Sequence, residues 1–572
     1  MSSVTTDPAG GYRPSSVSGI AGASGRILRA GAAAIVALVL LPIAALVFTA
    51  AQSSGDLWPH ILRNVLPVAI TDTALLAIGV GLIAGTIGTG TAWLVAVCRF
   101  PGRGVFEWAL LLPLAIPTYI QAYVYVDAIH PLGPIPTAIR AALGMTSPRD
   151  LWLPEVRNLP GCIVLLGLVL YPYVYLPARA AFLVQTASAL DAARTLGHGA
   201  TGTFFRIALP LARPAIAVGV TLALMETVND IGASEFLGVQ TLTLSIYSTW
   251  LNRSSLPGAA QIALFMLLVM IALVMLERWG RRHISHANVG ARSRPPMRRQ
   301  LAAGQATLAF LACLLPVALG FLLPAGHLVH AAYGRYMFNG LPETVFVEAL
   351  NTALFAAIGT ALALGCGLLL AIAARTGTVR SSRLLRLAAV GYAVPGTVLA
   401  VGLLVPLAGF DNLVSSTIQS LGGRATGLIL SGSGAALIIA YVIRFLAIPV
   451  GALETGYEKV GMTLDMAARS LGERPGGVVR LIHLPLLRPA LGTAALLVFV
   501  DCMKELPATL MLRPLNFETL ASHVYSEAAR GSYEDGAFAA LLIVLVGLIP
   551  VILLARLSRP RHDQEPSSGR SR

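Results

Sequence analysis

Residues 191–215 read DAARTLGHGATGTFFRIALPLARPA, and residues 466–490 read MAARSLGERPGGVVRLIHLPLLRPA. The second stretch repeats the first at an offset of 275 residues (466 minus 191), which indicates an internal duplication. Each copy combines an Ala-rich helix start, a Gly that ends the helix, a second short apolar helix and an L-P-x-x-R-P turn into a long apolar run. The shared residues are Ala192, Ala193, Arg194, Leu196, Gly197, Ile207, Leu209, Pro210, Leu211, Arg213, Pro214 and Ala215, which recur as Ala467, Ala468, Arg469, Leu471, Gly472, Ile482, Leu484, Pro485, Leu486, Arg488, Pro489 and Ala490.

These loops interrupt a chain that is too apolar for a water-soluble protein. Of its 572 residues, 56% are hydrophobic and 12% are charged, whereas soluble domains contain roughly 25% charged residues. We therefore predict an all-α membrane protein with about 12 transmembrane helices. The apolar runs that predict them lie near residues 32–51, 70–97, 105–127, 161–183, 213–237 and 259–276, and near 305–330, 349–374, 385–409, 430–452, 488–510 and 535–556.

A polar, basic stretch divides these runs into six and six. Residues 277–300 read ERWGRRHISHANVGARSRPPMRRQ, which is broken by Gly and Pro and is typical of a linker. This pattern predicts two tandem six-helix units related by pseudo-twofold symmetry. The expected boundaries are a tail at 1–31, a first unit at 32–276, a linker at 277–304, a second unit at 305–556 and a tail at 557–572.

The arginines predict the orientation. The formal net charge is +14, and the densest arginine clusters fall on one side of the membrane when the N-terminus is placed inside. The positive-inside rule accounts for this charge better than nucleic-acid binding does. We therefore expect a multi-pass protein of the bacterial inner (plasma) membrane, with both termini, the linker and both repeated loops in the cytoplasm.

The repeated loops are too patterned to be simple connectors. A short helix with small Ala and Gly residues on one side can dock in the groove of another protein. An interfacial amphipathic helix without a partner is the alternative interpretation.

The loops resemble the E-A-A-x(3)-G-x(9)-I-x-L-P signature of permease subunits in binding-protein-dependent ATP-binding-cassette importers. Asp191 replaces the Glu in the first copy, and Met466 stands at the acid position of the second, with Asp465 one residue earlier. The resemblance implies that each loop is a coupling helix that sits in a cleft of an ATPase subunit. The ATPase-coupling residues that it implies are Asp191, Ala192, Ala193, Gly197, Leu209, Pro210, Ala467, Ala468, Gly472, Leu484 and Pro485.

The sequence has no phosphate loop of the G-x-x-x-x-G-K-[ST] type, and neither of its two lysines, Lys459 and Lys504, follows a glycine. We therefore expect a transport subunit and not an enzyme, with no bound cofactor and with ATP used by a partner. The resemblance implies a separate cytoplasmic ATP-binding-cassette ATPase, as a homodimer, and a separate periplasmic substrate-binding protein.

Acidic residues follow each repeated loop inside an apolar run, where a charge is costly. At the same offset Glu226 matches Asp501 and Asp230 matches Glu505. The i, i+4 spacing predicts that both acids of a pair lie on one helix face. Together with Lys504 these four acids are our candidates for a translocation pathway, with no fixed metal site. The alternative is that they join neighbouring helices by pairing with Lys504 and Arg444.

A helix break is expected just beyond these acids. Gly232 and Pro507 occupy matched positions there, and a helix that breaks inside a membrane protein must line a cavity or be covered by protein.

The substrate is predicted from resemblance. Stretches such as METVNDIGASEFLGVQTLTLSIYSTW and MKELPATLMLRPLNFETLA are similar to those of fused ferric-iron permeases. Oxygen ligands suit a hard, highly charged cation. Carboxylates also suit thiamine or polyamines, and related permeases serve these substrates or phosphonates. An ion-gradient-driven secondary transporter also uses duplicated halves and buried acids, so it remains the alternative from another class.

Overall fold

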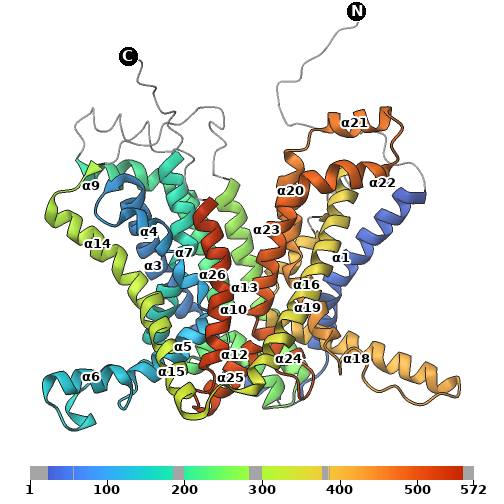
Figure 1. Ribbon diagram of the computed structural model, residues 1–572. Coiled ribbons are helices and arrows are strands. Elements are labelled where there is room, and N and C mark those ends of the chain that lie inside the picture. Colours follow the sequence, from blue (N-terminus) through green and yellow to red (C-terminus); the bar gives the residue numbers. More distant parts are fainter. Residues whose placement is uncertain are drawn as a thin grey trace, which may run out of the picture.

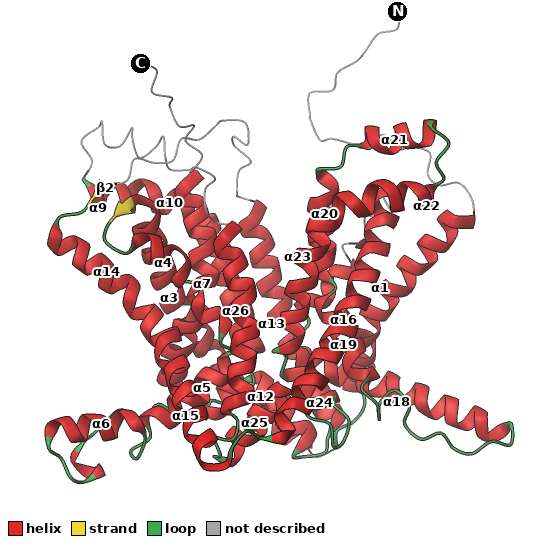
Figure 2. Ribbon diagram, viewed as in Figure 1, coloured by secondary structure: helices red, strands yellow, loops and turns green. Residues whose placement is uncertain are grey.

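The computed structural model describes residues 23–55, 57–184, 199–282, 299–376, 384–385 and 387–557. These residues are almost entirely helical (Figures 1 and 2). Strands within the described ranges are limited to one parallel pair, β1 (Cys98–Arg99) with β2 (Arg299–Gln300). The predicted coupling residues Asp191, Ala192, Ala193 and Gly197 lie outside the described residues.

The number of apolar helices agrees with the predicted dozen. Within the described part of the chain, ten helices are long and apolar enough to cross a membrane, and a bent pair adds an eleventh. The shorter apolar helix at Ala537–Leu553 corresponds to the last predicted run. The all-α membrane fold is therefore confirmed.

The helices lie on either side of the predicted linker. Those before the linker are α1 (Ala23–Ala50), α2 (Leu57–His60), η1 (Ile61–Val65), α3 (Leu66–Val97), α4 (Arg103–Ala109), η2 (Leu112–Ala115), α5 (Thr118–Ile129), α6 (Pro134–Leu143), η3 (Pro148–Asp150), α7 (Leu159–Val184), α9 (Ala200–Thr203), η4 (Phe204–Ala208), α10 (Leu209–Asn229), α11 (Gly232–Phe236), α12 (Leu242–Leu251) and α13 (Leu256–Arg282). Those after it are α14 (Ala303–Val317), η5 (Ala318–Leu322), α15 (Leu323–Asn339), α16 (Glu343–Thr376), η6 (Ala389–Ala393), α18 (Gly396–Ser420), α19 (Ala435–Phe445), α20 (Ala447–Glu458), α21 (Met462–Ser470), α22 (Pro475–Val478), η7 (Val479–His483), α23 (Leu484–Met503), α24 (Pro507–Leu512), α25 (Leu520–Arg530) and α26 (Ala537–Leu557).

The third predicted span of each half is broken and not a straight helix. The run expected at 105–127 bends by 89° between Arg103–Ala115 and Thr118–Leu143. Its counterpart, expected at 385–409, is interrupted between η6 and α18. Pro117 and Pro395 stand at the two breaks in an extended conformation, each with ψ 147°. Proline cannot continue the preceding helix but is well suited to the start of the next one, which explains both breaks.

The fifth span of each half also breaks, as Gly232 and Pro507 predict. Helix α10 ends at Asn229 before α11, and α23 ends at Met503 before α24. The prediction that both acids of each pair share one helix face is therefore wrong. Asp230 follows the end of α10 in an extended conformation, and Glu505 follows the end of α23, because each helix stops between its two acids.

The two halves exchange their first helices. Helix α1 packs against α16 and α18 of the second half, while α15 packs against α5 of the first half. Gly402 in α18 lies so close to α1 that an added Cβ would sit 2.4 Å from the Pro42 carbonyl oxygen. On the other side, the Tyr125 hydroxyl donates a hydrogen bond to the Leu319 carbonyl oxygen at 2.5 Å. Each half is therefore completed by a helix from the other.

The described parts of the repeated loops lie at the same end of the molecule. Figure 1 shows α9 and α21 at the top, on opposite sides of the bundle, and α6, α12 and α25 at the bottom. Helices α10 and α23 run from the upper end toward the lower one, so their breaks lie away from α9 and α21.

Candidate functional site

The four helix breaks meet at one cavity of about 180 Å³ between the two halves. Its lining includes the residues on either side of each break. These are Pro117, Thr118, Asp230, Gly232, Pro395, Glu505, Leu506 and Pro507. Broken helices in a membrane protein present backbone groups that must be satisfied by protein or by the contents of a cavity. The cavity is thus the place where the fold departs most from continuous helices.

All five residues predicted for the pathway line this cavity. Glu226 and Asp230 come from the first half, and Asp501, Lys504 and Glu505 come from the second. Arg444, the partner considered in the alternative interpretation, lines it too. Four carboxylates face two basic side chains, which leaves a formal excess of two negative charges when all are ionised.

Asp230 caps the helix that follows the break in the first half. Its Oδ1 accepts hydrogen bonds from the backbone N–H groups of Ala233 at 2.8 Å and Ser234 at 3.2 Å. Its Oδ2 accepts a hydrogen bond from the Thr118 hydroxyl, which comes from the start of α5. This carboxylate therefore satisfies the free donors of α11, as an N-cap residue does.

Glu505 plays the same part in the second half. Its Oε1 accepts from Ala508 N–H at 3.0 Å, and its Oε2 accepts from Thr509 N–H at 3.1 Å and from the Thr509 hydroxyl at 3.0 Å. Arg444 Nη1 lies 3.4 Å from Glu505 Oε1. Glu505 is thus a buried, fully bonded group at the start of α24.

The first acid of each pair is held differently. Lys504 Nζ lies 2.8 Å from Asp501 Oδ1, and the side chains of Lys504 and Asp501 are 36% and 28% exposed. Glu226 accepts no hydrogen bond from any of the described residues, and its charge interacts with Lys504 and Arg444. Glu226 and Asp501 therefore face the cavity without the backbone donors that fix Asp230 and Glu505.

Two glycines allow the breaks to come together. A Cβ on Gly232 would lie 2.4 Å from the Tyr119 Cβ, and a Cβ on Gly396 would lie 2.2 Å from Arg444 Nη1. A larger side chain would therefore require a backbone shift at position 232, and a shift of the Arg444 and Glu505 side chains at position 396. Gly396 N–H also donates to Asn229 Oδ1 at 3.2 Å, which links the start of α18 to the end of α10.

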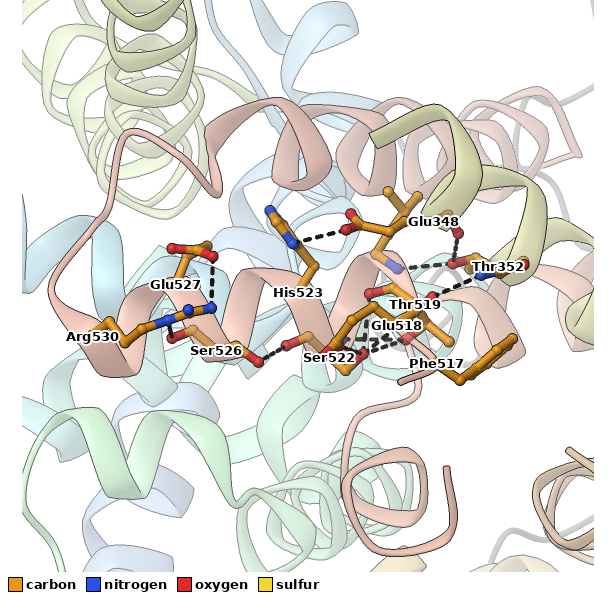
Figure 3. A network of polar contacts seen from close by, with 12 residues as sticks. Glu348, Thr352, Phe517, Glu518, Thr519, Ser522, His523, Ser526, Glu527 and Arg530 are labelled. Atoms are coloured by element: carbon orange, nitrogen blue, oxygen red, sulfur yellow. Dashed lines mark hydrogen bonds and ion pairs between the residues drawn. The ribbon is translucent and has the colours of Figure 1, made fainter. Parts of the chain in front are cut away.

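Two other acids from the same sequence segments lie outside the cavity. The Tyr525 hydroxyl donates to Glu235, so that α25 is joined to α11 across the two halves. Glu518 accepts from the Ser522 hydroxyl at 2.6 Å within the polar network on α25 shown in Figure 3. In the same network His523 Nδ1 lies 3.0 Å from Glu348 Oε1, which ties α25 to α16.

The cavity is not a preformed metal site. Across the described ranges, no group of three or more His, Cys, Asp and Glu side chains converges closely enough to hold a metal ion. Oxygen atoms suitable for a hard cation are present, but two of the four carboxylates are occupied by helix caps.

The second repeated loop forms α21 and is anchored by Asp465. Arg375 Nε lies 3.2 Å from Asp465 Oδ2, and His483 Nε2 lies 3.0 Å from Asp465 Oδ1. Burial alone would raise the pKa of Asp465, but the hydrogen bonds from His483 and Arg375 outweigh it and hold that pKa below its usual value. Asp465 thus provides the ion pair that Met466, at the acid position of the signature, cannot form.

The other predicted coupling residues of this loop occupy helix ends and surfaces. Ala467 is exposed on α21, Ala468 is buried, and Gly472 has a φ of +86° just beyond the helix. Leu484 and Pro485 begin α23, as Leu209 and Pro210 begin α10. Exposed apolar side chains also lie on the loop, namely Leu464, Met466 and Leu471 at 44%, 52% and 85% exposure.

Several contributing residues were missed by the sequence interpretation. Arg375 and His483 come from outside α21, and no sequence signal identifies them as the partners of Asp465. Thr118 could have been found, because a Thr directly after Pro117 at a helix start is typical of a break.

Comparison with known proteins agrees with this arrangement. Residues 81–285 match the family described as "Binding-protein-dependent transport system inner membrane component". The chain is 26% identical over 494 residues to the Fe(3+)-transport system permease protein FbpB 2 of Haemophilus influenzae, which covers 85% of this chain and 89% of that protein. It is 25% identical over 524 residues to a probable ABC transporter permease protein of Sinorhizobium fredii, covering 87% and 88% of the two chains.

A shorter relative matches only part of the chain. A probable molybdenum ABC transporter permease protein of Haloferax volcanii is 29% identical over 239 residues, which is 41% of this chain and 83% of that protein.

Proposed function

We propose that this chain, whose residues 81–285 form a permease domain of the binding-protein-dependent transport systems, is the membrane subunit of an ATP-driven importer of ferric iron. The observation that supports it most is the cavity that Glu226 and Asp501, one from each half, both line without hydrogen bonds from backbone donors. In this proposal, the units at 32–276 and 305–556 act as the two permease halves.

Ferric iron is favoured over the other substrates by charge and by relatedness. A hard trivalent cation prefers oxygen ligands, and the cavity has an excess of carboxylates over basic groups. The relative named for Fe(3+) transport is similar over both halves, whereas the relative named for molybdenum is similar over less than half of the chain. In an importer of oxyanions, basic side chains would be expected to outnumber carboxylates along the passage.

The coupling of ATP hydrolysis to transport is assigned to the two repeated loops. The exposed apolar side chains of α21 offer a surface for an ATPase subunit, and Arg375 connects Asp465 of α21 to the end of α16. Helix α16 in turn packs against α23, which ends at the cavity. A movement of α21 can therefore be transmitted through packed helices to the break at Lys504.

The orientation follows from where these loops lie. In this proposal α9 and α21 lie in the cytoplasm, where Arg206, Arg213, Arg469 and Arg474 satisfy the positive-inside rule, and we assign both termini to the same side. The opposite end, with α6, α12 and α25, then faces the periplasm and receives the substrate-binding protein.

The proposal is tested by neutralising the two acids that face the cavity. The complete importer, with its ATPase and binding protein, is reconstituted in vesicles, and ATP-dependent uptake of ferric iron is measured for Glu226→Gln/Asp501→Asn. We expect uptake to be lost while the assembly with the ATPase is unchanged. Glu155→Gln/Glu343→Gln, which neutralises one exposed acid in each half outside the cavity, is the matched control and should transport normally.

Other outcomes would replace the proposal. Full uptake by the double variant would remove the pathway role of these acids. Uptake sustained by a proton gradient without ATP would favour a secondary transporter. ATP-dependent uptake of molybdate, thiamine or a polyamine, without uptake of ferric iron, would identify a different substrate.

A further inference from the structure

Lys504 occupies an unusual position for a lysine in this protein. The chain has only two lysines among its 41 basic Lys and Arg residues, and Lys504 lies in the cavity whereas Lys459 lies at the end of α20. Lys504 follows the last residue of α23, directly at the helix break. Its ammonium group contacts Asp501 at 2.8 Å and interacts with the charge of Glu226.

The two basic residues of the cavity have different surroundings. Arg444 approaches Glu505, a carboxylate that three hydrogen bonds already fix in place. Lys504 instead contacts Asp501, which lacks backbone donors, and its charge, like that of Arg444, also acts on Glu226. Among the described residues the side chains of Lys504 and Asp501 have no further hydrogen-bond partner, whereas Glu505 accepts three hydrogen bonds, so Lys504 is less constrained than Arg444.

We propose that Lys504 is a built-in substitute for the transported cation. In the resting protein its ammonium offsets one of the two negative charges of Glu226 and Asp501, and an entering cation takes its place on these two carboxylates while the side chain swings aside. This inference rests on the proposed function, since it assigns Lys504 a role in cation passage through the same cavity.

The side chain of a lysine is well suited to being displaced from carboxylates by an entering cation. Its ammonium is a compact point charge on a flexible four-carbon stem, so it can leave one site without breaking a rigid bidentate geometry, unlike arginine. A metal that replaces it gains two carboxylate oxygens, and the displaced ammonium stays close to the carboxylates in the aqueous cavity. Tyr119 also lines the cavity, and its buried hydroxyl has no hydrogen-bond partner among the described residues.

In this proposal Lys504 also limits the binding of stray cations in the empty passage. Two uncompensated carboxylates across a narrow cavity repel each other and would bind any available cation. Lys504 offsets one of these two charges, so binding then requires a cation of high charge that competes with the ammonium. Lys504 is therefore a specificity-determining residue and not a structural one.

Terbium binding to the purified full chain tests this inference directly. Terbium(III) is a hard trivalent cation without redox chemistry, and its emission is sensitised by nearby tyrosines such as Tyr119, Tyr173 and Tyr392 of the cavity lining. We expect Lys504→Met to bind terbium at least about tenfold more tightly than the wild type, because the competing charge is gone. Lys504→Arg, which keeps the charge in a more rigid bidentate geometry, should bind terbium no more tightly than the wild type, whereas Lys459→Met, the matched control, should resemble the wild type.

The binding must also depend on the two carboxylates. Adding Glu226→Gln/Asp501→Asn to Lys504→Met should abolish the gain in terbium affinity. The proposal is overturned if Lys504→Met binds no more tightly than the wild type, or if the gain persists without Glu226 and Asp501.

A second measurement uses the unmodified protein and so does not depend on how the variants fold. Saturating terbium should increase the rate at which an amine-specific acylating reagent modifies Lys504, measured by mass spectrometry, and leave the rate at Lys459 unchanged. No change at Lys504 would show that the ammonium is not displaced. Neither experiment needs ATP, the ATPase or the binding protein, so this inference can fail while iron uptake by the complete importer stands, and the reverse.

Discussion

Arg375 Nε in α16 lies 3.2 Å from Asp465 Oδ2 in α21, and this ion pair joins the surface helix to a long helix of the bundle. Arg375 also donates to the Val460 carbonyl oxygen at 2.8 Å, and His483 bonds the second oxygen of Asp465. The acid is displaced by one residue from the position that the signature favours, yet it has two partners. The loop is therefore anchored by a different residue from the one that the motif would select.

Asp465→Ala should loosen α21 from the bundle and reduce ATP-driven uptake. Removing the acid leaves Arg375 without its carboxylate, at a cost of about 1–3 kcal/mol. Asp465→Ala/Met466→Glu, which restores an acid at the position of the signature, should not rescue uptake. A shift of one residue turns the side chain by about 100° around the helix, away from Arg375. Hydrolysis by the bound ATPase is the parallel readout, since it should continue while uptake falls. Rescue by Met466→Glu would show that any acid on this helix suffices.

The attachment of α21 should depend on pH only under acidic conditions. The pKa of Asp465 is depressed in the folded protein, so its contribution to stability is fully present above its unfolded pKa of ~3.9 and is lost as pH falls through the lower folded value. Amide exchange in α21, corrected for the intrinsic rate, should be constant from about pH 8 to pH 5 and should rise only below about pH 4. The variant Asp465→Ala should show no such transition. A transition centred between about pH 6 and 7 would assign the anchor to a group other than this carboxylate.

The exchange of first helices predicts contrasting effects for two glycines of α18. Gly402→Ala places a Cβ 2.4 Å from the Pro42 carbonyl oxygen and should lower the stability of the folded chain by about 1–3 kcal/mol, because α1 must move. Gly409→Ala, on the same helix with no atom within 4 Å of its added Cβ, should raise it by up to about 1 kcal/mol through helix propensity. Unfolding of the purified protein by heat or denaturant measures both. Equal effects at the two positions would mean that α1 does not pack on α18.

The fold was largely predictable, but the connections between its halves were not. Apolar runs predict where the helices lie, because a helix that spans a bilayer must present apolar side chains to the lipid. The offset of the repeat indicates which segments of the two halves correspond. The same side chains give no information on which helix they pack against, since lipid and protein are equally apolar neighbours. The packing of α1 on α18 therefore has no sequence signal.

The sequence predicted which residues form the site, but not what each of them does there. The offset matched Glu226 with Asp501 and Asp230 with Glu505, and all four line the cavity. Helical spacing assigned both members of a pair to one face, but it assumes that the helix continues. Gly232 and Pro507 signalled the breaks, and a short polar side chain just before a break is also the usual signature of an N-cap. Combining those two signals separates Asp230 and Glu505 from the acids that face the cavity.

That separation predicts different phenotypes for the two acids of the first half. Asp230→Ala removes the acceptor for the Ala233 and Ser234 N–H groups and should cost about 0.5–2 kcal/mol of stability, whereas Asp230→Asn, which also caps helices well, should retain most of it. If the carboxylate of Asp230 acts only as a cap, Asp230→Asn should also retain most ATP-driven uptake. Glu226→Gln should do the reverse, with normal stability and little uptake. Thermal unfolding and vesicle uptake of the same preparations compare the variants. An Asp230→Asn protein that is as stable as the wild type but inactive would show that the charge of Asp230 acts on the substrate as well.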